Sequence, residues 1–165
     1  MTRIERLGLE GIYPAIICPM SDDFQIDEAE LAAHISSLDC ISGIRGFLVN
    51  GHAGENYMLS RDEKRRVLDI SRSTVSDETV LVCGVNAEST LEAVAHAKDI
   101  EAAGGDAILV FPPNSWALSV TQEMAIAHHM AIIEATDLSV FLYQAPVLTG
   151  TMAYSQDILE ALVAL

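Results

Sequence analysis

Short apolar runs and longer amphipathic segments alternate along the whole of this chain. The short runs are typical of buried β-strands, and the longer segments space their apolar residues three and four positions apart, as on one face of a helix. The predicted strands are Gly11–Cys18, Gly46–Val49, Val80–Cys83, Ala107–Val110 and Ser139–Tyr143. The predicted helices are Asp27–Ile41, Ser60–Ser73, Ser89–Ala103, Thr121–Ala135 and Ser155–Leu165. The alternation predicts an α/β fold with parallel strands and right-handed crossovers.

The predicted helices begin and end at recognisable signals. Ser60 and Glu63 have the spacing of a capping box, in which each side chain satisfies a free amide at the helix start. Thr121 is a good N-cap, and the Gly104-Gly105 pair suits the end of the third helix. These signals support the helix boundaries independently of the apolar spacing.

The length of each strand–helix unit suggests the architecture. Units of about 30 residues match those of a (β/α)8 barrel of ~250 residues. The 165 residues then predict a TIM-barrel type fold with about five of eight βα units. The alternative is a complete, doubly wound five-stranded sheet of the flavodoxin type. The pattern does not separate the two, and no linker divides residues 1–165, which we treat as a single domain.

The negative net charge of the chain argues against two classes of partner. The formal net charge is −15, and the cations are Lys64, Lys98 and arginines at or before Arg72. Nucleic acids and anionic membranes need a basic face, so we expect neither as a partner. No apolar run reaches the ~18 residues of a membrane span, and the charged N-terminus lacks the apolar core of a signal peptide. We therefore expect a cytoplasmic protein.

The sequence offers no pattern for a metal or an organic cofactor. Cys18, Cys40 and Cys83 lack zinc-type spacing, so we predict reduced, mostly buried thiols. There is no Gly-x-Gly-x-x-Gly or P-loop pattern, which weakens a nucleotide-binding interpretation.

Two loops that follow predicted strands carry the candidate chemistry. The first contains Gly51, His52, Ala53 and Gly54. Glycines let the backbone take positive φ and let a ligand approach closely, and successive amides in such a turn bind a carboxylate. The second loop begins with Tyr143, at a strand end where a barrel places its substrate and where a hydroxyl relays protons. The alternatives are an ordinary βα turn and a tyrosine that satisfies one hydrogen bond.

Together these loops resemble the dihydrodipicolinate synthase / N-acetylneuraminate lyase family. Its members are barrel enzymes that hold pyruvate or another 2-oxo acid as a Schiff base on lysine. The family's Gly-(Thr/Ser)-Thr-Gly-Glu loop and the following helix are matched by Gly51, Gly54, Glu55, Leu59, Ser60 and Glu63. Its Tyr-Asn-x-Pro-x-x-Thr-Gly motif is matched by Tyr143, Pro146, Thr149 and Gly150, with Gln144 a close substitute for asparagine.

The resemblance implies roles for these residues. The Gly51–Gly54 backbone would hold the 2-oxo acid carboxylate, and Tyr143 would relay protons during Schiff-base formation and carbon–carbon bond making or breaking. His52 and Ala53 replace the family's hydroxyl residues, so the backbone contacts survive without the hydroxyls. His52 can replace a hydroxyl as a donor, act as an acid or base near neutral pH, or simply cap the loop. The resemblance implies no cofactor and no metal.

Several departures point away from a true dihydrodipicolinate synthase. The synthase carries an arginine just before Thr-Gly, and here that position is Leu148, which cannot bind a carboxylate. The synthase also uses a tyrosine pair after strand four, where this chain has Phe111–Trp116 without a tyrosine. The loss of the arginine favours a sugar-acid or aromatic substrate. Trp116 either lines a pocket or packs in the core.

The Schiff-base lysine is expected on the next strand of the family, beyond Leu165. Lys64 and Lys98 fall on helices of the outer ring, where we predict solvated surface cations rather than nucleophiles. We therefore predict a truncated barrel that is inactive by itself. Its open strand edges and apolar interior would drive formation of a homo-oligomer.

Two functions from different classes remain. The first is a lyase that acts on pyruvate or another small 2-oxo acid, by aldol cleavage or condensation or by dehydration. The alternative is a catalytically inactive fragment or a non-enzymatic α/β binding module. A coding region that continues past Leu165 with a lysine-bearing strand would favour the first.

Overall fold

The computed structural model describes residues 4, 8–145 and 153–165. Its strands are β1 Gly46–Val49, β2 Val80–Val85, β3 Ala107–Val110 and β4 Ser139–Leu142. Its α-helices are α2 Glu28–Asp39, α3 Arg61–Thr74, α4 Thr90–Ala102, α5 Gln122–Ile133 and α6 Gln156–Val163, with short 3-10 helices η1 His52–Gly54 and η2 Asn114–Ala117. The predicted strands from Gly46 onward and the predicted helices are confirmed to within two residues at each end.

The helix starts are set by polar side chains that accept a hydrogen bond from an amide of the first turn. These N-caps are Asp27, Ser60, Ser89, Thr121 and Ser155. The predicted capping box is confirmed, because Glu63 also accepts the amide of Ser60 at 2.8 Å. At the end of α4, Gly104 takes the left-handed conformation, with φ +81°.

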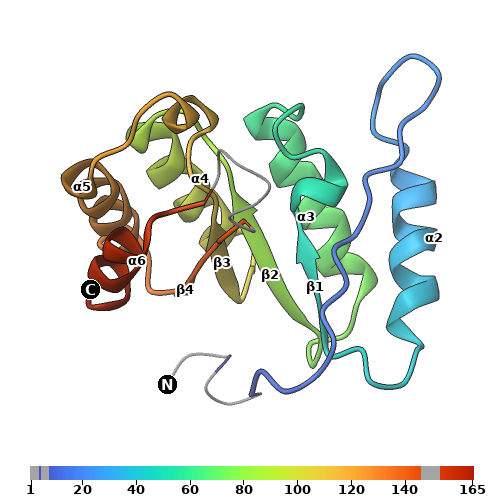
Figure 1. Cartoon of the computed structure of the whole chain (residues 1–165). Helices are drawn as coiled ribbons and strands as arrows, with labels where there is room; N and C mark the ends of the chain where they lie inside the picture. Colours follow the sequence, from blue (N-terminus) through green and yellow to red (C-terminus); the bar gives the residue numbers. More distant parts are fainter. Residues whose placement is uncertain (1–3, 5–7, 146–152) are drawn as a thin grey trace.

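Strand order decides between the two architectures that the sequence left open. The sheet is parallel with the consecutive order β1-β2-β3-β4. Each α-helix packs on the next one along the chain, so the helices follow one another around the sheet (Figure 1). A doubly wound sheet has strands out of sequence order and helices on both faces, whereas consecutive strands inside a ring of helices are the arrangement of a barrel.

The segment Gly11–Cys18 runs beside β1 but does not form the continuous strand that we predicted. It is joined to the β1 side by two isolated parallel bridges, Ile12–Ile44 and Ala15–Leu48. Between the bridges the β1 side advances by one residue more than the N-terminal segment, as in a bulge. Pro14 also has no N–H to donate, although its carbonyl accepts the amide of Leu48 at 3.0 Å.

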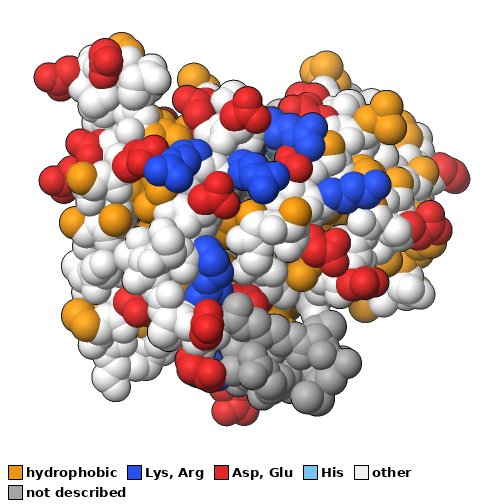
Figure 2. All heavy atoms as spheres, turned by 180° about the vertical axis from the view of Figure 1, so that it is seen from behind, with side chains coloured by type: hydrophobic (Ala, Val, Ile, Leu, Met, Phe, Trp, Pro, Cys, Tyr) orange, Lys and Arg blue, Asp and Glu red, His pale blue; other side chains and the backbone are white. Residues whose placement is uncertain are grey.

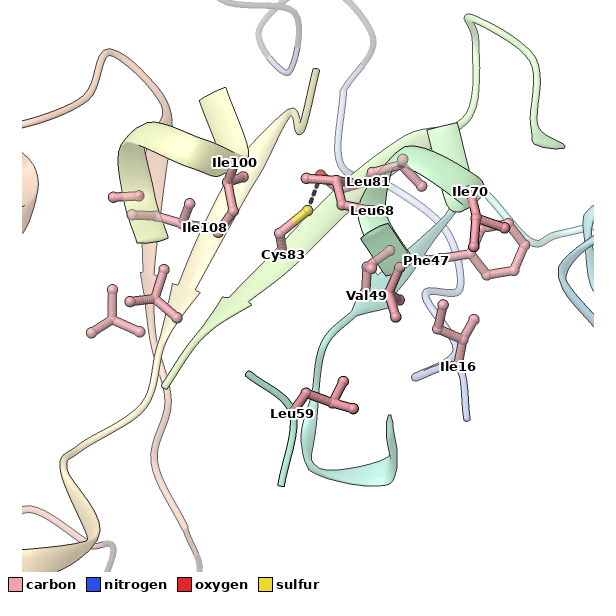
Figure 3. Close-up of a cluster of buried hydrophobic side chains, with 14 of the residues drawn as sticks. Ile16, Phe47, Val49, Leu59, Leu68, Ile70, Leu81, Cys83, Ile100 and Ile108 are labelled. Atoms are coloured by element: carbon pink, nitrogen blue, oxygen red, sulfur yellow. Dashed lines mark hydrogen bonds between the residues drawn. The ribbon is translucent and has the colours of Figure 1, made fainter. Parts of the chain in front are cut away.

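The main core lies between the sheet and the helices that cover it. Alternate strand residues such as Phe47, Leu81 and Ile108 are fully buried there, against Leu68 of α3 and Ile100 of α4 (Figure 3). This spacing follows from the strand period of two, which directs every second side chain to the same face. The helical face of the sheet therefore carries the main buried core.

The opposite face of the sheet is apolar but only partly covered. Its residues include the half-buried Val82 and Phe141, and the N-terminal residues Ile4 and Tyr13 pack against it. Leu9 and Tyr13 help to enclose a cavity of about 230 Å³ there. In a closed barrel this face is the packed interior.

The outer edge of β4 is also open among the described residues. An apolar groove of about 420 Å³ runs along it and is lined by Ile133, Val140, Phe141, Leu142, Leu162, Val163 and Leu165. An unpaired strand edge beside an apolar groove favours association with another strand. The homo-oligomer stays a prediction.

The side of the molecule shown in Figure 2 carries Lys and Arg side chains among Asp and Glu side chains. Arg61 donates two hydrogen bonds to Asp99, and Arg66 donates two to Glu28. The surface is therefore of mixed charge. Within the part of the chain that the structure describes, no helix is long and apolar enough to cross a membrane.

Phe24 lies in a strained position that suggests a stabilising substitution. It has φ +62°, in the left-handed region, and its side chain is 82 % exposed. That conformation costs an L-residue about 1–2 kcal/mol, which a glycine avoids at a smaller entropic cost. We expect Phe24→Gly to raise the free energy of unfolding by about 1 kcal/mol in urea denaturation. Phe24→Ala, which keeps Cβ, is the control, and equal effects of the two variants would contradict the strain argument.

Candidate active site

Three aromatic rings meet at the carboxyl ends of the strands. His52 comes from η1 after β1, Phe111 directly follows β3, and Tyr143 directly follows β4. The Phe111 ring centroid lies 4.2 Å from that of His52 and 4.5 Å from that of Tyr143, and the His52 and Tyr143 centroids are 5.2 Å apart. The structure thus brings together the two side chains that the sequence analysis singled out, although 91 residues separate them along the chain.

Phe111 forms the floor of this cluster and was not singled out from the sequence. It is 2 % exposed, whereas His52 and Tyr143 are half-buried. Its amide donates to Val85 at 2.9 Å, and the amide of Tyr143 donates to Val110 at 3.0 Å, so the sheet ladder continues into the site. The available signal was its position immediately after a predicted strand, where barrels place functional residues.

A glycine near the carboxyl end of β2 makes room for the cluster. A Cβ on Gly84 would lie 3.1 Å from the Phe111 ring and would collide with the backbone carbonyl of Asn50. A glycine inside a strand costs stability and marks a close approach of another backbone. Gly84 therefore allows the loop after β1 and the Phe111 ring to close over β2.

In the loop after β1, the residues with positive φ are not the glycines that the sequence analysis singled out. The left-handed residues are Asn50, with φ +53°, and Glu55, with φ +52°, whereas Gly51 has φ −81°. Gly54 instead permits close packing, because a Cβ there would lie 3.0 Å from the carbonyl of Ile16. The glycines of this loop thus serve close approach rather than positive φ.

Two backbone amides of this loop, those of His52 and Ala53, have no acceptor within the described part of the protein. Gly54 donates to Gly51 at 3.1 Å and Glu55 donates to His52 at 3.0 Å, which closes η1. The amides of His52 and Ala53 make no hydrogen bond to another described residue. Successive free amides at the start of a helical turn suit an anion such as a carboxylate.

Burial sets the charge state of His52. Partial burial among aromatic rings lowers the pKa of His52, because desolvation disfavours the imidazolium. At pH 7 the ring is therefore mainly neutral, with one nitrogen able to donate and the other able to accept. In this form it can donate one hydrogen bond and accept another while the ring carries no charge.

The structure describes only some of the other residues that the sequence analysis named. The motif residues Pro146, Leu148, Thr149 and Gly150 lie outside the described residues. Trp116 packs in a second cluster of side chains, with its ring centroid 5.2 Å from that of His128 and 6.5 Å from that of Tyr154. Of the two roles that the sequence left open for Trp116, the structure therefore supports packing.

Lys64 is not the solvated surface cation that we predicted, whereas Lys98 is exposed. The Lys64 side chain is half-buried, and its Nζ donates to the carbonyl of Asn86 at 2.9 Å. Burial lowers its pKa. The prediction was wrong because helical spacing places a residue on a face but does not show whether a long side chain folds back over the neighbouring strand end.

The thiols and carboxylates give no sign of a metal centre. Among the described residues, no three His, Cys, Asp or Glu side chains are placed to hold an ion. The three cysteines are free, but only Cys83 is buried, while Cys18 is half-buried and Cys40 exposed. The prediction that most of the thiols are buried was therefore wrong.

The fold and the placement of the site define the class of the protein. Parallel strands in consecutive order, covered by helices that follow one another around the sheet, are the architecture of TIM barrels, and the candidate side chains lie at the strand ends where such barrels place their sites. The chain belongs to the dihydrodipicolinate synthetase family, whose model matches residues 8–164.

Individual relatives agree with this assignment. The chain is 33 % identical to the 4-hydroxy-tetrahydrodipicolinate synthase of Methanothermobacter thermautotrophicus, over 88 % of this chain and 50 % of that protein. It is 29 % identical to the probable mitochondrial 4-hydroxy-2-oxoglutarate aldolase of Emericella nidulans, over 92 % of this chain and 50 % of the relative. The chain therefore spans about half the length of the curated relatives that it matches.

Solved structures show the same fold. The structure of CdNal from Clostridium difficile in complex with mannosamine superimposes with a TM-score of 0.87 and 29 % identity, over 96 % of this chain and 53 % of that one. The dihydrodipicolinate synthase of Agrobacterium tumefaciens gives a TM-score of 0.82 and 32 % identity, over 93 % of this chain and 50 % of that one. These matches confirm the barrel-type fold expected from the sequence.

Proposed function

We propose that this chain forms the carboxylate-binding and proton-relay half of a lyase that acts on pyruvate or another 2-oxo acid. The observation that carries the proposal is the convergence of His52, Phe111 and Tyr143 beside the free amides of η1. The amides of His52 and Ala53 would bind the carboxylate. The aromatic rings would face the carbon chain of the substrate.

In this proposal the substrate ketone condenses with a lysine amine, forming a C=N bond and releasing water. The lysine would come from the part of the family's length that this chain does not span. Tyr143 would carry protons to and from the ketone oxygen and the reacting carbon. The neutral imidazole of His52 would replace a hydroxyl of other family members as the nearby donor or acceptor.

Leu148 stands where the synthase pattern has an arginine that binds a carboxylate. This difference favours a substrate that places no second carboxylate there. The stretch Phe111–Trp116 also lacks the tyrosine pair that the synthase carries after strand four, which suits an apolar or sugar-like partner better than a charged one. We therefore propose aldol cleavage or condensation, or dehydration, rather than the synthase reaction. A cytoplasmic location and a homo-oligomer remain predictions.

The test is intact-mass spectrometry after incubation with pyruvate and borohydride, which reduces an imine to a stable amine. No adduct on the 17.8 kDa chain, together with saturable pyruvate binding in NMR titration, is the expected result. Absence of binding would favour the alternative of an inactive fragment or binding module. An adduct on this chain, mapped to Lys64 or Lys98, would overturn the exclusion of that lysine as a nucleophile.

The role of Tyr143 gives a separate prediction for a form of the protein that carries the complete barrel. Tyr143→Phe removes the hydroxyl and keeps the ring that contacts Phe111, so the site keeps its shape. We expect the rate of imine formation, measured by borohydride trapping in rapid quench, to fall by about 100-fold. Pyruvate affinity should change by less than about threefold. An unchanged trapping rate would exclude Tyr143 as the proton relay.

A further inference from the structure

We infer that Lys64 is a positioning residue that fixes the loop bearing His52 to the neighbouring strand end. This inference rests on the proposed function only in assigning ligand binding to that loop. Lys64 lies in the first turn of α3, outside the aromatic cluster, and makes hydrogen bonds to residues that follow two adjacent strands.

The first connection is made by the backbone of Lys64. Asn50 directly follows β1, and its Nδ2 donates to the carbonyl oxygen of Lys64 at 2.9 Å. The carbonyl of Asn50 in turn accepts from Nδ2 of Asn56 at 2.9 Å. Asn50 and Asn56 are 3 % and 0 % exposed, so these bonds are shielded from water. They fix the residue that precedes Gly51 and His52 in a left-handed conformation that asparagine tolerates.

The second connection is made by the side chain. Nζ of Lys64 donates to the carbonyl of Asn86, which directly follows β2, at 2.9 Å. One residue thereby joins the loops that leave β1 and β2. A similar connection joins the next pair of loops, because Glu88 accepts the amides of Asn114 and Ser115 at 2.9 and 3.0 Å.

A small cavity lies beside this connection. Its volume is about 20 Å³, enough for one water molecule, and its lining includes Asn50, Lys64, Gly84 and His96. Oδ1 of Asn50 and both ring nitrogens of His96 are buried without a hydrogen-bond partner. The cavity is too small for pyruvate, so it does not place Lys64 in contact with substrate. The contact of Lys64 with the loop is therefore structural, and it is made through Asn50.

The Nζ group of Lys64 is therefore one of the donors that support the geometry of this loop. Loss of the Nζ donor leaves the buried carbonyl of Asn86 unsatisfied and releases α3 from the end of β2. The loop after β1 then loses one of its supports, and the amides of His52 and Ala53 no longer stay aligned. A displacement of about 1 Å is enough to weaken a preorganised site.

The experiment compares Lys64→Met with the matched control Lys98→Met, since Lys98 is exposed and the chain has no other lysine. Hydrogen exchange of the peptide spanning residues 49–57, measured by mass spectrometry, should accelerate by about tenfold in Lys64→Met only. Exchange in α5 should stay unchanged, which separates a local effect from global loosening. Pyruvate affinity in NMR titration should fall by about tenfold, and Lys64→Arg, which keeps a donor, should restore most of both.

Unchanged exchange at residues 49–57 in Lys64→Met would overturn the inference, as would equal effects of the two lysine variants. If the wild-type chain does not bind pyruvate, the proposed function fails, while the exchange measurement still tests the role of Lys64. Should Lys64→Met fail to fold, Lys64→Gln is measured in its place, because it keeps a donor that is too short to reach Asn86. Wild-type exchange in Lys64→Gln would then overturn the inference.

Discussion

Lowering the pH from 7 to about 4 is expected to unfold this chain through its buried histidines. His96 and His128 are 4 % and 2 % exposed. Burial lowers the pKa of each to about 4, helped by the charge of Lys64 near His96 and by His129 beside His128. The unfolded value is about 6.5, so the unfolded chain binds more protons between these limits. Stability is therefore complete above pH 6.5 and is lost as the pH falls toward 4.

The expected loss is large compared with the stability of an ordinary domain. Each histidine contributes roughly 3 kcal/mol over this window, out of a typical total of about 5–15 kcal/mol. Burial lowers the pKa of His129 as well, which adds in the same direction. Carboxylates whose pKa is lowered, such as that of Asp99, act mainly below about pH 4 and fall outside the window.

The measurement is urea unfolding followed by circular dichroism at several pH values from 7.5 to 4.5. His128→Gln removes one titrating group, so the slope of stability against pH should decrease by about one proton. Leu118→Ala, which removes no titrating group at a position 92 % exposed, is the control and should leave the slope unchanged. A urea midpoint that stays constant from pH 7 to 5 would show that the buried histidines are not neutral in the folded chain.

Gly84→Ala is expected to destabilise the chain by about 3 kcal/mol, at the upper end for overpacking a core. The added Cβ would collide with the carbonyl of Asn50, a backbone atom that cannot rotate away. Asn50 is also held by its hydrogen bonds to Asn56 and Lys64. For a chain of this length the loss corresponds to a fall of roughly 10 °C in Tm.

Gly51→Ala is the matched control, because the substitution is the same and lies one residue beyond Asn50. Gly51 has φ −81°, and the nearest atom to an added Cβ is the end of the flexible Leu48 side chain, at 2.9 Å. We expect a loss below about 1 kcal/mol. Differential scanning calorimetry of both variants tests the argument, and equal losses would mean that the close approach over Gly84 is not what the glycine provides.

Much of the local structure followed from the sequence. The run Ala107–Val110 and the capping box at Ser60 gave a strand and a helix start in the predicted places, because strand burial and end-capping are settled by neighbouring residues. The segment Gly11–Cys18 did not follow in the same way. Its pairing depends on a bulge opposite β1, which only the partner strand determines.

The residues of the candidate site also differ in whether the sequence could identify them. His52 and Tyr143 could be selected from the sequence because each lies at or just after the end of a predicted strand, in a loop that resembles a known family. Phe111 and Lys64 could not be assigned their places in this way. The ring of Phe111 acquires its position from contacts with His52 and Tyr143, and Lys64 from the carbonyl of a residue 22 positions away.

The sequence alone determined the alternation of strands and helices, the helix caps and the two loops with candidate chemistry, because these depend on residues within a few positions of one another. The tertiary structure decided the consecutive strand order, the convergence of three rings from separate loops and the burial of Lys64. Each of these depends on contacts between segments far apart in the chain. Such contacts form only when parallel strands bring their carboxyl ends to one edge of the sheet.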